Sequence, residues 1–159
     1  GQPGLFTMEG ANFAVRSASC RLHGELLTVT AEGPGFRLHL PCIPFGIASN
    51  PSELAGREWN PSTADLNASD TLNEGGYVFL RDVEYVPHAL AVRCTRVDSA
   101  GKRATFDIAM SGCFTDEDSL RELTGFADFI LDSPPCPECG QPLRSSKAQQ
   151  CFACGAVWH

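Results

Sequence analysis

Two Cys-x-x-Cys pairs near the C-terminal end limit what this chain can fold into more than any other feature of its sequence. They are Cys136-Pro-Glu-Cys139-Gly and Cys151-Phe-Ala-Cys154-Gly, and eleven residues separate Cys139 from Cys151. Each pair forms a tight turn that aims two sulfurs at one point, and the glycine after it can adopt a positive φ at no steric cost. Four thiolates in this arrangement can surround one metal ion, so the spacing predicts a tetrahedral Zn²⁺ site.

The same residues resemble the zinc-ribbon or rubredoxin-like knuckle family. The resemblance covers residues 134–159 and nothing before them, and it rests on Cys136-Pro137-Glu138-Cys139-Gly140 and Cys151-Phe152-Ala153-Cys154-Gly155. It implies that Cys136, Cys139, Cys151 and Cys154 are the metal ligands. It implies Zn²⁺ as the ion, with iron as the alternative because rubredoxins use the same sulfur set.

A metal would also explain how so short a segment folds. Below about 40 residues a chain buries too little apolar surface to fold without a metal or disulfides. Zinc binding then supplies folding free energy, on the order of 10 kcal/mol or more in zinc peptides. Because protein would fill all four positions, the site is predicted to be structural rather than catalytic. Two disulfides are the alternative use of the same four cysteines.

The rest of the chain, residues 1–133, is predicted to be mainly β: an antiparallel β-sandwich or small barrel with one short helix. Alternation of apolar and polar residues predicts six strands, at 14–22, 27–31, 36–42, 77–86, 89–97 and 103–110. Pro41 and Pro44 are expected to end the third strand, and Val86-Pro87-His88 to turn the chain. The last two strands form the clearest hairpin, with Val92 and Phe106 among the inward positions.

The predicted helix begins at Thr115-Asp-Glu-Asp118, whose sequence is typical of a capping box. Leu120 and Leu123 would share one face of it, and Gly125 would end it. Residues 126–131 are compatible with continued helix or with a final strand. Asp132-Ser-Pro-Pro135 is predicted to be a stiff linker into the ribbon.

A long loop is predicted at 47–76, where polar residues and the Asn50-Pro51 and Asn60-Pro61 pairs interrupt the alternation. Only residues 51–55 suggest a helical turn. Loops of this length inside a compact domain are usually functional or disordered. Trp59, the largest apolar side chain in the loop, could anchor a partner or ligand. The alternative is that it folds down and caps the core of the sheet.

Four other residues are candidate contacts for a partner or ligand: Tyr77, Phe79, Asp82 and Glu84. Asp82 and Glu84 would share one strand face and could act as an acid–base pair if one were desolvated; the alternative is a solvated strand end. Three histidines, at positions 23, 39 and 88, are predicted to lie at the surface. Four further cysteines, at positions 20, 42, 94 and 113, are predicted to be buried free thiols.

The net charge of the chain favours some classes of partner over others. The formal net charge is −7, and residues 1–133 carry 10 Lys and Arg against 18 Asp and Glu. Nucleic-acid binding draws most of its affinity from basic residues that neutralise phosphates, so it is disfavoured. An acidic surface instead favours a basic protein partner.

Cysteine usage and the N-terminal sequence indicate the compartment. Thiolate ligands and unpaired cysteines suit a reducing environment, so a cytoplasmic location is expected. The chain has no run of 18 apolar residues, so neither a transmembrane helix nor a membrane partner is expected. Residues 1–7 lack the features of a secretory signal, and Met8-Glu9 could be the natural start, with residues 1–7 a foreign leader.

Three functions fit these observations. A non-catalytic cytoplasmic binding protein is favoured, because the metal site is closed, the charge is acidic and no nucleophile motif or phosphate-binding loop is present. The second is an enzyme or small-molecule binder with its site under the 47–76 loop, near Trp59, Tyr77 and Phe79. The third is an OB-like nucleic-acid-binding protein with a zinc ribbon.

Overall fold

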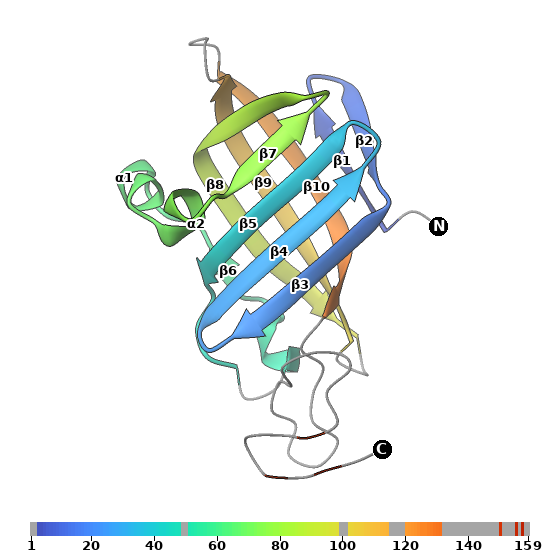
Figure 1. Cartoon of the computed structure of the whole chain (residues 1–159), viewed down its shortest axis with the longest axis vertical. Coiled ribbons are helices and arrows are strands. Elements are labelled where there is room, and N and C mark those ends of the chain that lie inside the picture. Colours follow the sequence, from blue (N-terminus) through green and yellow to red (C-terminus); the bar gives the residue numbers. More distant parts are fainter. Residues whose placement is uncertain are drawn as a thin grey trace.

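The structure is a computed structural model that describes residues 3–48, 51–98, 102–114 and 120–131, with Gln150, Gly155 and Val157; the side chains of residues 112–114 and 120 lie outside the description. It is mainly β and contains a closed barrel of seven strands (Figure 1), which confirms the predicted fold class. The barrel strands are β3 (Ser17–His23), β4 (Leu26–Gly33), β5 (Phe36–Pro44), β7 (Tyr77–Leu80), β8 (Val83–Val97), β9 (Arg103–Phe114) and β10 (Leu120–Leu131).

β10 closes the barrel. One of its edges pairs with β9 over its whole length, and the other pairs antiparallel with β1 (Gly4–Met8) and then in parallel with β3 at Ile130 and Leu131. β1 also pairs with β2 (Ala11–Val15). The segment that sequence analysis set apart as a leader, 1–7, thus contributes most of β1, and its Phe6 is fully buried.

Aromatic side chains fill the interior of the barrel. The ring centroids of Phe6 and Phe36 lie 4.9 Å apart, and Phe106 lies 5.5 Å from Phe129 and 5.8 Å from Phe45. Barrels of about eight strands are just wide enough for side chains to fill. In this seven-stranded barrel the buried aromatic and aliphatic side chains form one hydrophobic core.

The 47–76 segment is ordered where it is described, which corrects the predicted loop. It holds η1 (Pro51–Leu54), as expected, and also β6 (Glu58–Trp59), α1 (Thr63–Asn67) and α2 (Asp70–Asn73). The Oγ atoms of Ser62 and Ser69 accept from the backbone N–H of Asp65 and Leu72, which caps the two helices. These serine caps are the sequence signal that the loop prediction overlooked.

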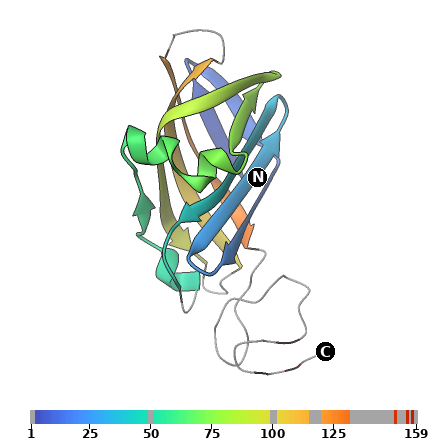
Figure 2. The ribbon, with the colours of Figure 1, turned by 60° about the vertical axis from the view of Figure 1, so that its left-hand side comes forward.

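The same segment covers a gap in the barrel wall (Figure 2). β7 is much shorter than its neighbours β5 and β8, so part of β5 and part of β8 are not paired with it. Over these parts, α2 packs on β5, and α1, η1 and β6 pack on β8. Leu54 and Leu66 of this segment are fully buried. Both side chains belong to the hydrophobic core of the barrel.

Sequence analysis predicted one strand at 77–86, but the structure has parts of two strands there, β7 and β8, with a turn between them. Arg81 and Asp82 have φ of 50° and 68°, so they form a two-residue turn between β7 and β8. β8 then continues through Val86-Pro87-His88, where a turn was expected, with a register irregularity after Pro87. The turn resets the alternation: Val78 and Tyr85 are buried, and Phe79 and Glu84 lie on the outer face.

Two other strand predictions near the N-terminus were wrong. Residues 14–22 belong to two strands, β2 and β3, with Arg16 between them. Pro41 does not end β5, because it lies in a β-bulge in which Pro41 and Cys42 together stand opposite Thr28 of β4. Proline has no backbone N–H, and at a bulge this absence breaks no hydrogen bond between the strands. The hairpin predicted at 89–97 and 103–110 is confirmed, including its inward positions Val92 and Phe106.

The predicted short helix is also corrected, because Leu120–Leu131 is strand β10. Leu123, Ala127, Phe129 and Leu131 are buried while the residues between them are more exposed, which is the two-residue period of a strand. The proposed capping box at 115–118 lies outside the described residues.

Gly125 permits the close approach of β10 and β1. A Cβ at this position would stand 2.3 Å from the carbonyl oxygen of Leu5 and 2.7 Å from the Cα of Phe6. We therefore expect Gly125→Ala to separate the two strands and lower the free energy of unfolding by about 1–3 kcal/mol. Urea unfolding followed by circular dichroism measures this. The outward neighbour Thr124→Ala is the control and should change stability by less than about 0.5 kcal/mol; equal midpoints for the two variants would contradict the expectation.

Candidate functional site

Strand pairing aligns polar and aromatic residues on the outer wall of the barrel. Phe79 of β7 pairs with Arg37 of β5 on one side and with Glu84 of β8 on the other, and Tyr77 pairs with His39. Side chains of directly paired residues lie on the same face of a sheet. We call these five residues, Arg37, His39, Tyr77, Phe79 and Glu84, the wall cluster.

The aromatic rings of the wall cluster contact one another. Tyr77 and Phe79 meet edge to face with centroids 5.1 Å apart, and the His39 ring lies 5.6 Å from Tyr77. The Arg37 guanidinium lies 4.9 Å from the centre of the Phe79 ring, a cation–π contact. Because Tyr77 and Phe79 are only half-buried, their outer surfaces face solvent.

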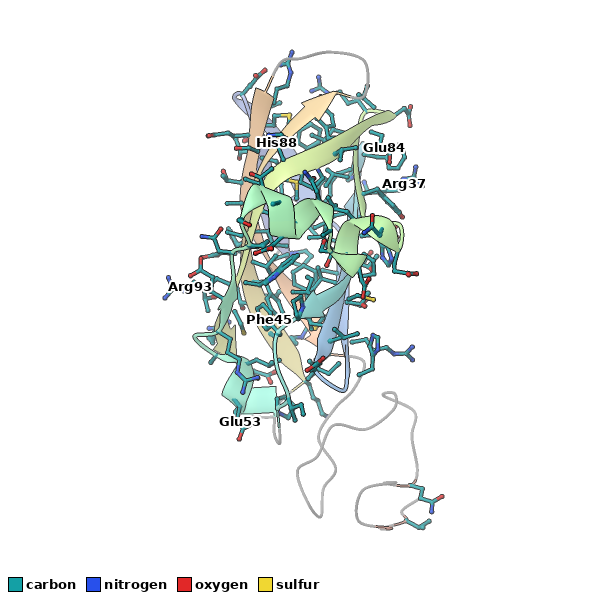
Figure 3. All side chains as sticks on the ribbon, turned by 90° about the vertical axis from the view of Figure 1, so that its left-hand side faces the viewer. Arg37, Phe45, Glu53, Glu84, His88 and Arg93 are labelled. Carbon is teal, nitrogen blue, oxygen red and sulfur yellow. The ribbon has the colours of Figure 1, made fainter. Side chains whose placement is uncertain are left out.

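One further contact orients the histidine. Nδ1 of His39 and the hydroxyl Oγ1 of Thr30 on β4 are hydrogen-bonded at 3.1 Å. Figure 3 shows Arg37 and Glu84 on the same side of the barrel. The wall cluster is therefore a continuous surface built on three paired strands, whose backbone fixes the spacing of its side chains.

The 47–76 segment, which packs on β5 and β8, is acidic. The 47–76 segment carries five carboxylates, at Glu53, Glu58, Asp65, Asp70 and Glu74, against Arg57 as its single base. Nη1 of Arg57 donates to the carbonyl oxygens of Phe45 and Gly46, both at 3.1 Å. Asp70 and Glu74 are exposed at the two ends of α2, which packs against β5. Two exposed carboxylates therefore lie on the helix that packs against β5, the strand that carries Arg37 and His39.

Of the other predicted contact residues, two lie apart from the wall cluster. Trp59 pairs with Val92 at the edge of β8 and packs, partly buried, against the core, which agrees with the capping alternative. Asp82 lies in the exposed turn between β7 and β8, so it does not share a strand face with Glu84, and the predicted acid–base pair is not formed.

Three of the barrel cysteines are free thiols, as predicted. Cys20 and Cys94 are buried and Cys42 is partly buried; the side chain of Cys113 lies outside the description. Burial raises the pKa of Cys94 to about 11, against a smaller lowering by a backbone hydrogen bond at Arg96. This thiol therefore stays protonated at neutral pH and is a poor nucleophile.

The predicted metal ligands Cys136, Cys139, Cys151 and Cys154 lie outside the described residues. Within the part of the chain that is described, no group of three or more His, Cys, Asp or Glu side chains could hold a metal ion. Two described features flank the second cysteine pair: Gln150 and Val157 form an antiparallel bridge, and Gly155 has φ of 77°.

Sequence reasoning found Tyr77, Phe79 and Glu84 but did not include Arg37 and His39 in the site. Alternation along 36–42 did place these two side chains on the outer face. Their pairing with β7 was not visible, because the 47–76 segment separates the two strands in sequence.

Comparison of the chain with protein-family models, with curated proteins and with solved structures finds no match. In the ranges that the structure describes, no helix is both long and apolar enough to cross a membrane. The function must therefore be argued from the geometry of the wall cluster and the chemistry of the chain itself.

Proposed function

We propose that this chain is a non-catalytic cytoplasmic binding protein whose wall cluster contacts a basic protein partner. The observation that carries the proposal is the contact between the half-buried rings of Tyr77 and Phe79 on a rigid sheet, with the carboxylate of Glu84 paired beside Phe79. Aromatic side chains dominate the binding energy of protein interfaces because they bury a large area at little entropic cost. A packed barrel interior and the protonated thiol of Cys94 support a binding role over a catalytic one.

The charge around the wall cluster favours a partner that presents arginine or lysine. A guanidinium or ammonium group could stack on the free face of Tyr77 and pair with the carboxylate of Glu84. The exposed carboxylates of Asp70 and Glu74 would attract such a partner from a distance. Arg37 already occupies one side of Phe79, and His39 contacts the ring of Tyr77.

We further propose that residues 134–159 form a zinc ribbon in which Cys136, Cys139, Cys151 and Cys154 hold one structural Zn²⁺. Four thiolates are the donor set that tetrahedral zinc prefers in structural sites. The positive φ of Gly155 and the bridge between Gln150 and Val157 support a tight turn at the second pair. In this proposal the ribbon is a metal-stabilised appendage and takes no part in chemistry.

Affinity capture with matched baits tests the wall cluster. Immobilised wild-type protein, the double variant Tyr77→Ser/Phe79→Ser and the control Phe126→Ser are each incubated with cytosol of the source cells. Phe126 is a suitable control because it is an exposed aromatic residue on β10, away from β5 and β7. Bound proteins are identified by quantitative mass spectrometry at low and at moderate salt.

We expect a basic protein to be retained by the wild type and by Phe126→Ser, and to be reduced about tenfold or more on the double variant, the loss typical of an interface hot spot. Moderate salt should weaken retention, because the attraction is partly electrostatic. Equal retention by all three baits would refute the role of the wall cluster. Recovery of nuclease-sensitive RNA or DNA in its place would favour the nucleic-acid alternative.

A further inference from the structure

A second feature, distinct from the wall cluster, lies at one end of the barrel. Three hairpins turn there in two residues each: Glu9-Gly10 after β1, Pro34-Gly35 after β4 and Arg81-Asp82 after β7. In the first and third turns both residues have positive φ, which is the geometry of type I′ turns. The backbone N–H of Arg81 donates to the carbonyl oxygen of Gly35 at 2.9 Å and joins two of the turns. Short turns tied together in this way give the end of the barrel a fixed shape.

A cavity of about 380 Å³ opens between the first and third turns. Its floor consists of Met8, Phe13, Leu80 and Tyr85, each only 3–7% exposed. Pockets for small molecules have volumes from about 300 to 1,000 Å³ and are mostly apolar with a few polar groups that fix orientation. This cavity, which we call the mouth pocket, has the size and lining for a small ligand with an apolar body.

The charged side chains at the rim of the mouth pocket determine whether it favours an anionic or a cationic ligand. Two guanidinium groups, of Arg81 and Arg121, line it with one carboxylate, that of Glu9. Glu9 forms an ion pair with Arg121. Arg81 lies over the Phe13 ring, 5.6 Å from its centre, and forms no ion pair within the described residues. The pocket therefore has one positive charge in excess, in a protein whose net charge is negative.

We propose that the mouth pocket binds a small monoanionic amphiphile, namely a carboxylate attached to an aromatic or branched aliphatic body. The carboxylate pairs with the guanidinium of Arg81, whose planar fork matches two carboxylate oxygens. The body lies on the floor formed by Phe13, Leu80 and Tyr85. The inference does not depend on the proposed protein partner, because the mouth pocket and the wall cluster occupy different parts of the barrel.

Three probes separate the contributions of charge and body: 3-phenylpropionate, its neutral amide 3-phenylpropanamide, and acetate, which has no body. Each is titrated into ¹⁵N-labelled full-length protein and followed by chemical-shift changes. We expect 3-phenylpropionate to bind about tenfold or more tightly than either other probe, since it alone has both groups. The shifted resonances should belong to the ends of β1, β2, β7 and β8 at the pocket.

A pair of arginine variants tests the assignment. Arg81→Asn should weaken binding of 3-phenylpropionate about tenfold, to the level of the amide. Asn tolerates the positive φ at this position, so the turn is kept. The control Arg96→Asn removes an exposed arginine near the far end of β8 and should leave binding unchanged. Equal affinities for the acid and the amide, shifts away from the mouth pocket, or unchanged binding by Arg81→Asn would each overturn the proposal.

Discussion

Replacing Cys139 by serine is expected to abolish binding of one equivalent of Zn²⁺ and to unfold residues 134–159 while the barrel stays folded. The effect is large because zinc supplies on the order of 10 kcal/mol or more of folding free energy to such a segment. Three remaining thiolates cannot complete the tetrahedral set. The measurement is elemental analysis of protein purified under reducing conditions, together with an amide spectrum of the barrel.

Cys42→Ser is the matched control, because Cys42 is a partly buried free thiol of the barrel. This variant should keep one zinc per chain. A Cys139→Ser protein that retains one tightly bound zinc would contradict the proposed ligand set. Wild-type protein without stoichiometric zinc or iron in reduced form would contradict the ribbon itself.

The second large effect concerns the interior of the barrel. Phe106→Ala is expected to lower the free energy of unfolding by about 3–5 kcal/mol, as large-to-small changes of buried aromatic residues do. Phe106 is fully buried and contacts the rings of Phe45 and Phe129, so its removal leaves a cavity that the barrel cannot close. Since small domains are stable by only about 5–15 kcal/mol, the loss is a large fraction of the total.

Equilibrium urea unfolding measures this change, with Phe126→Ala as the control. Phe126 is 47% exposed on the outside of β10, so its truncation should cost much less. Similar midpoints for the two variants would mean that the interior is not tightly packed. That result would reopen the possibility of a ligand site inside the barrel.

Local periodicity predicted the strands whose partners are near in sequence. The hairpin of β8 and β9 was found with its inward face, because its two arms follow one another directly. Alternation fails where turn chemistry is unusual. Arg81-Asp82 has no glycine to mark a two-residue turn, so 77–86 was interpreted as one strand. A single strand would put Phe79 and Glu84 on opposite faces, whereas they pair on the same face.

β10 shows a second kind of failure. The acidic residues before Leu120 suggested the start of a helix, and the partners that make 120–131 a strand lie on β1, β3 and β9. β1 and β3 are more than 100 residues earlier in the chain. The wall cluster could not be predicted for the same reason, because it depends on the pairing of β5 with β7, which local sequence patterns do not determine. The mouth pocket could not be predicted either, because it requires the relative positions of two separate turns and of Arg121 on β10.

The pairing of β10 with three other strands, β1, β3 and β9, affects how this protein folds during its synthesis. During synthesis the early strands can form only an open, curved sheet, since the segment that joins its two sides emerges from the ribosome after all the others. Folds dominated by such distant contacts fold slowly, and an open sheet presents unpaired edges that associate with other chains. A chain interrupted before residue 120 would lack only β10 of the barrel strands, and its unpaired sheet edges would make it prone to aggregate.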